Sequence, residues 1–124
     1  MGFLIDTAEK VGDLLDAVDG LTLTLDVSIM FFCGMTTEEI ASFAPRTRHV
    51  QSRPGSRDKV QVRLKNNKTD FGPILDSLHE ACYRGWIATE FVWMERWGCD
   101  QVYVTEESRQ LLSLLKGDFR PSAI

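Results

Sequence analysis

Hydrophobic and polar positions recur along the chain with two different periods, which predict helices and strands in turn. Apolar residues return every three or four positions over residues 8–18, as on one face of a helix capped by Asp6 and Thr7. Residues 21–28 then alternate with a period of two and are rich in strand-forming side chains. Residues 29–33 are continuously apolar, and we expect them to continue this strand as a loop.

The second repeat of the pattern begins at Thr36. Thr36 and Glu39 have the spacing of a capping box, which predicts a short helix that stops before Pro45. Residues 47–52 then predict the second strand, and residues 59–64 an additional short one.

The third repeat completes the chain. Asp70 is positioned to cap a helix whose apolar stripe extends to Cys82, and Gly85 is expected to end that helix. Residues 86–92 predict the third main strand, and residues 105–117 a last helix. We therefore expect one domain over residues 1–117 and a flexible C-terminal tail over residues 118–124.

Helices and strands that alternate with short connections predict an α/β fold with three or four largely parallel strands and right-handed crossovers. So small a parallel sheet leaves strand edges unpaired. We therefore expect the chain to associate, either as a homodimer or with a partner that supplies more strands.

Composition narrows the class of protein. The 124 residues are 44% hydrophobic and 26% charged, which is typical of one globular domain. The apolar runs are too short to cross a bilayer and the N-terminus does not resemble a secretory signal, so we expect a cytoplasmic protein without a membrane partner. The three cysteines, odd in number and without a Cys-x-x-Cys pair, predict reduced thiols.

The net charge of −4 conceals a basic segment. Eight of the 14 Lys and Arg residues lie in residues 46–68. Such a segment can hold a phosphate or an acidic sugar, for example through Arg53, Arg57 and Lys59, or it can simply be a solvated surface, which we favour. The segment has no interleaved aromatic residues, so no nucleic-acid partner is expected.

Several segments together resemble the C-terminal half of the sugar phosphate isomerase/epimerase family, the xylose isomerase-like TIM barrels. The segments are GFLIDT (2–7), LTLDVS (23–28), RHVQ (48–51), DF (70–71), ACYRGW (81–86), TEF (89–91) and WGCD (97–100). The resemblance implies a partial TIM barrel, here a half-barrel completed by dimerisation. It also implies a divalent-metal site at the ends of the strands, where a proton moves between neighbouring sugar carbons.

The resemblance assigns the metal site residue by residue. Asp26 matches an Asp ligand of the family, and Glu90 matches the Glu that is both ligand and catalytic acid/base. Gln51 stands where the family has its metal-binding His, and an amide is a poor replacement for imidazole. His49 lies two residues earlier, about 6.6 Å along a strand, and cannot simply take that place. We therefore expect Mn²⁺ or Mg²⁺ to bind weakly at best.

The substrate residues implied by the resemblance are also only partly present. Arg57 matches a sugar-contacting Arg. Apart from the resemblance, Trp93, with Phe91 and Trp97, can line a sugar pocket after the third strand, although we favour a role in covering the barrel edge. Ile29 stands at the position of a substrate His, and the first Glu ligand of the family falls before Met1. Each retained residue also has a structural interpretation: the carboxylates can pair with Arg57 or meet solvent, and the aromatic residues can cover the barrel edge.

Three hypotheses follow. The first, which the lost residues favour, is a degenerate half-barrel without autonomous catalysis that binds a small sugar or phosphorylated ligand. The second is a divalent-metal-dependent sugar isomerase or epimerase, active only when another chain supplies the missing barrel half. The third is a nucleic-acid enzyme on the same barrel, for which the chain has too few His and carboxylate ligands.

Overall fold

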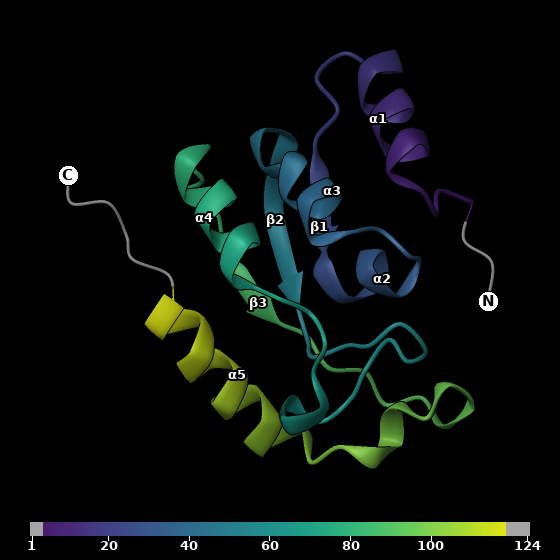
Figure 1. Ribbon diagram of the computed structural model, residues 1–124, viewed down its shortest axis with the longest axis vertical. Coiled ribbons are helices and arrows are strands. Elements are labelled where there is room, and N and C mark those ends of the chain that lie inside the picture. The colour runs from purple at the N-terminus through teal and green to yellow at the C-terminus, as the bar shows by residue number, and fades with distance from the viewer. Residues whose placement is uncertain (1–3, 119–124) are drawn as a thin grey trace.

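The computed structural model describes residues 4–118 and has an α/β architecture (Figure 1). Three parallel strands, hydrogen-bonded in the order β1-β2-β3, form one small open sheet: β1 (Leu23–Asp26), β2 (Thr47–Ser52) and β3 (Ile87–Thr89). The predicted α/β class and the parallel strands are confirmed, and the open sheet is consistent with part of a barrel.

Helices precede, separate and follow the strands. The α-helices are α1 (Ala8–Ala17), α2 (Val27–Phe32), α3 (Thr37–Ser42), α4 (Gly72–Glu80) and α5 (Val104–Asp118). Four short 3₁₀ turns complete the described elements: η1 (Ala44–Arg46), η2 (Leu64–Asn66), η3 (Glu95–Trp97) and η4 (Cys99–Gln101). Within residues 4–118, no helix is both long and apolar enough to cross a membrane.

The helix starts follow the capping chemistry of the sequence. The Thr7 hydroxyl accepts a hydrogen bond from the backbone N–H of Lys10, and α1 begins at Ala8, the residue after Thr7. At α3 the capping box is complete, because the Thr36 hydroxyl accepts from the Glu39 N–H and the Glu39 carboxylate accepts from the Thr36 N–H. Both predicted starts are confirmed.

The first strand is shorter than predicted, and residues 29–33 are not a loop. The chain leaves β1 at Asp26, whose carboxylate accepts from the Ile29 N–H at 3.1 Å and so caps α2. Helix α2 runs through most of the segment expected to be irregular. A local side-chain cap therefore ends the strand that the period-two pattern would have continued.

Three further expectations are corrected. Residues 59–64 form no strand, although the Val62 N–H donates to the Pro54 carbonyl at 2.9 Å. The third strand is only Ile87–Thr89. Cys82 lies beyond α4 with a φ of +55° and is exposed, so it does not belong to the apolar stripe.

The expected C-terminal tail, residues 118–124, is described only at its first residue. Asp118 is the last residue of α5, and residues 119–124 lie outside the described residues.

The two faces of the sheet differ in character. Leu25 and Val50 are buried neighbours in register, and they belong to the hydrophobic core with Ile40 of α3 and Leu78 of α4. On the other face, neighbours in register are polar and at least partly exposed: Thr24 pairs with His49, and Asp26 with Gln51. This second face is the one that a closed barrel would enclose.

Candidate functional site

The residues with candidate chemistry gather where the parallel strands end. Asp26 is the last residue of β1 and lies beside Gln51 of β2. Gln51 lies in turn beside Ala88 of β3, and Glu90 follows two residues later. Since side chains alternate between the faces of a sheet, Asp26, Gln51 and Glu90 share the polar face. The structure therefore brings the three expected metal ligands to the same end of the sheet, where the strands finish.

A buried arginine lies between the two carboxylates. The Arg53 side chain is only 4% exposed. One terminal nitrogen of its guanidinium is 2.8 Å from Asp26 Oδ2, and the other donates to Glu90 Oε2. The middle strand thus supplies a cation that joins carboxylates from the two outer strands.

The position of Arg53 follows from the same period of two. It comes directly after β2, two residues beyond Gln51, and so continues the polar face. Glu90 is held level with it because the Glu90 N–H donates to the Ser52 carbonyl at 2.9 Å, which extends the pairing of β2 and β3. Asp26 is fixed from the other side by its capping role in α2.

The residues at this end of the sheet do not fit a divalent metal. Asp26 Oδ1 already accepts from the Ser28 hydroxyl at 3.0 Å and from the Ile29 N–H at 3.1 Å, and Oδ2 accepts from Arg53. The guanidinium occupies the space between the carboxylates that a metal would need. Within residues 4–118, no three His, Cys, Asp or Glu side chains are grouped closely enough to hold a metal ion.

The ion cluster of Arg53, Asp26 and Glu90 is electrostatically costly as well as cohesive. Buried charges lose hydration, and only close partners compensate for that loss. Arg53 Nε is buried without a hydrogen-bond partner among the described residues. An unpaired buried donor costs about 1–3 kcal/mol of folding stability. Burial also raises the pKa of the nearby Cys99 thiol, and the positive charge of Arg53 opposes this rise.

Arg57, the expected sugar contact, is engaged elsewhere. Its guanidinium donates to the Phe31 carbonyl at 2.7 Å and to the Met35 carbonyl at 2.9 Å, and it lies 3.9 Å from the centroid of the Phe31 ring. These carbonyls belong to the end of α2 and the turn after it, where a cation is favourable. Of the two arginines, Arg53 rather than Arg57 pairs with the carboxylates.

The aromatic residues after β3 divide into two roles. Phe91 is partly buried and packs against the hydrophobic core. Trp93 is 66% exposed, so its ring offers an open face to solvent. An exposed indole of this kind can stack on a sugar ring.

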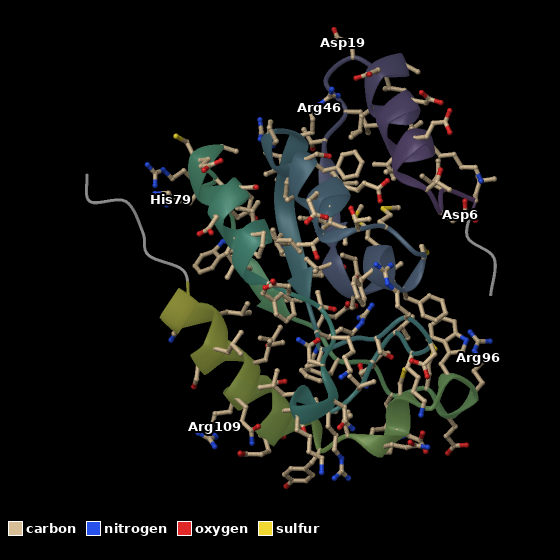
Figure 2. The ribbon with its side chains drawn as sticks, in the orientation of Figure 1. Asp6, Asp19, Arg46, His79, Arg96 and Arg109 are labelled. Carbon is tan, nitrogen blue, oxygen red and sulfur yellow. The ribbon has the colours of Figure 1, made fainter. Side chains whose placement is uncertain are left out.

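The basic segment also divides into two groups. Arg53 and Arg57 are committed to the contacts above, and Arg46 donates to the carbonyls of Leu15 and Leu21 at 2.6 and 3.0 Å. Arg46, the last residue of η1, therefore ties the segment before β2 to α1 and to the loop between α1 and β1 (Figure 2). The remaining five cations of the segment are exposed: Arg48, Lys59, Arg63, Lys65 and Lys68.

Comparison of this chain with protein-family models, with curated proteins and with solved structures found no match. The resemblance to sugar phosphate isomerases therefore depends on the sequence segments alone.

We predict that Arg53→Ala lowers the free energy of unfolding by about 3–5 kcal/mol, because it leaves Asp26 and Glu90 facing each other without a cation. Urea unfolding followed by circular dichroism measures the change. Adding Asp26→Asn and Glu90→Gln to this variant should recover part of the loss, since both negative charges are then removed.

Arg84→Ala is the control, because Arg84 is exposed and its loss should change stability little. A loss below about 1 kcal/mol for Arg53→Ala would contradict the cohesive role of the ion cluster.

Proposed function

We propose that this protein is a degenerate half-barrel, similar to sugar phosphate isomerases and epimerases, that does not catalyse a reaction by itself. In this proposal the chain binds a small sugar or phosphorylated ligand and assembles with a second copy. One observation supports the loss of catalysis above all others: the Arg53 guanidinium lies between Asp26 and Glu90, where the metal chemistry of the family would require a free site.

The same contact removes the acid/base that the resemblance assigns. A carboxylate acts as a general base only when it can reach the substrate proton and accept it. Glu90 instead accepts a hydrogen bond from the Arg53 guanidinium, so this carboxylate is engaged within the protein rather than presented to a substrate. Gln51 and Ile29 add to the loss, since neither side chain can supply the imidazole that the resemblance expects there.

A second candidate function is a metal-dependent isomerase completed by another chain. The convergence of Asp26 and Glu90 at the same end of the sheet favours this candidate. It requires Arg53 to leave both carboxylates, so that a metal and new ligands from the partner can replace the guanidinium. The two candidates differ in what the purified chain does with manganese.

We predict that the metal-stripped protein binds no manganese at micromolar concentration in calorimetric titration, because Arg53 competes for both carboxylates. Asp26→Ala serves as the control, since any heat from this site must disappear in that variant. Micromolar binding that is present in the native chain and lost in Asp26→Ala would contradict the proposal and favour the isomerase.

The proposed assembly is based on the free edge of β1. In the described sheet β1 pairs only with β2, so its other side can accept another strand. Beside this edge, an apolar groove of about 320 Å³ runs between α1, β1 and α2, with Leu14 and Ile29 among its lining residues. We propose a second copy as the occupant, because two β1 edges and their apolar flanks can meet around a two-fold axis.

We predict that the protein sediments at micromolar concentration with twice the mass of the 14.1 kDa chain. Leu14→Lys should shift it to the monomer, because a charge would be placed in the apolar interface. Leu112→Lys is the matched control, since Leu112 is equally exposed at 42% but lies on α5. A monomeric native chain, or equal effects of both variants, would count against this interface.

A further inference from the structure

Two loops that follow the strands line a polar pocket that includes none of the three residues of the ion cluster. Residues 59–66 follow β2 and residues 98–102 follow β3, and both loops lie beyond the C-terminal ends of the strands (Figure 1). The pocket has a volume of about 260 Å³. Its lining residues are Lys59, Gln61, Val62, Arg63, Lys65, Asn66, Gly98, Gln101 and Val102.

The charge of this pocket is entirely positive. Lys59, Arg63 and Lys65 line it, and no Asp or Glu does. Among the ion pairs of residues 4–118, none involves these three cations. Like charges gathered around one cavity repel each other, so an anion placed between them gains from all three.

The pocket is held in shape by buried hydrogen bonds. The Gln61 side chain is almost fully buried, and its amide donates to the carbonyls of Val92 and Cys99 at 3.0 and 2.8 Å. Its carbonyl oxygen accepts from the Val92 N–H at 2.9 Å. These three bonds fasten the loop after β2 to the loop after β3, so the pocket floor is formed before any ligand arrives.

Helix α5 braces the same pair of loops. The Leu64 N–H donates to the Glu107 carboxylate at 2.6 Å, so the nearby acidic side chain is already engaged. Arg63 Nε donates to the Gln101 carbonyl at 3.3 Å, which spans the two loops and leaves the terminal guanidinium nitrogens available to a ligand. A prearranged site loses less entropy when it binds.

We infer that this pocket binds the phosphate group of a small phosphorylated compound. The inference depends on the ligand-binding part of the proposed function and places that ligand at Lys59, Arg63 and Lys65 rather than at Arg53 and Arg57. A phosphate monoester carries close to two negative charges at neutral pH and offers three acceptor oxygens. Arginine and lysine supply the charge, and the amides of Asn66 and Gln101 supply neutral donors.

The size of the pocket limits the ligand. Sites that enclose whole drug-sized molecules occupy about 300–1,000 Å³, so this pocket suits a phosphate with a few further atoms. The sugar part of a phosphorylated sugar would then extend out of the pocket into solvent. Affinity should therefore come mainly from the phosphate, and inorganic phosphate is a fair first probe.

The test is a titration of ¹⁵N-labelled full chain with inorganic phosphate and then with ribose 5-phosphate, at constant ionic strength. We expect saturable amide shifts in residues 59–66 and 98–102, with a dissociation constant at or below about 1 mM. Lys59→Gln and Lys65→Gln should each weaken binding at least about fivefold, which is the effect of a single pair of unit charges about 4 Å apart in water.

Lys68→Gln is the matched control, because Lys68 is exposed, belongs to the same basic segment and does not line the pocket. Its binding should match that of the native chain. Equal weakening in all three variants, or shifts centred on other residues, would overturn the pocket while leaving a phosphate-binding protein. Absence of binding by both probes would overturn phosphate binding by this chain, whereas the loss of metal chemistry is judged separately with manganese.

Discussion

The contact of Arg53 with Asp26 and Glu90 is the constraint on which the other features depend. It joins the ends of all three strands through one side chain, at the point where each strand turns into a loop. Asp26 also caps α2, so the same carboxylate fixes the start of a helix. A metal ion could join such carboxylates as well, but an arginine of the chain does so without a cofactor.

This contact decides where binding chemistry remains. Because the carboxylates are occupied, the strand ends offer little to a sugar or a metal. The cations of the basic segment divide accordingly, with Arg46, Arg53 and Arg57 holding the fold and Lys59, Arg63 and Lys65 facing a pocket. In the proposed function, the surface for ligands therefore lies on the loops beyond the sheet rather than at the ends of the strands.

Periodicity and capping signals in the sequence predicted the regular part of the fold. The capping box of Thr36 and Glu39 and the bounds of β2 are local features, and both are confirmed. Helix α2 was missed because the Asp26 cap competes with the strand pattern. Arg53 was expected only as part of the basic segment, because its partners lie 27 and 37 residues away in the sequence.

The burial of Gln61 could not be predicted from the sequence for the same reason. Nothing in its neighbourhood in the sequence marks it as buried, because its three hydrogen bonds reach Val92 and Cys99.

The most direct test of the proposed loss of metal chemistry is a crystal structure of the metal-stripped protein soaked in manganese chloride, with anomalous diffraction data. We predict no manganese peak between Asp26 and Glu90, and the Arg53 guanidinium in place between the two carboxylates. A peak there, with Arg53 turned away, would contradict the proposed loss.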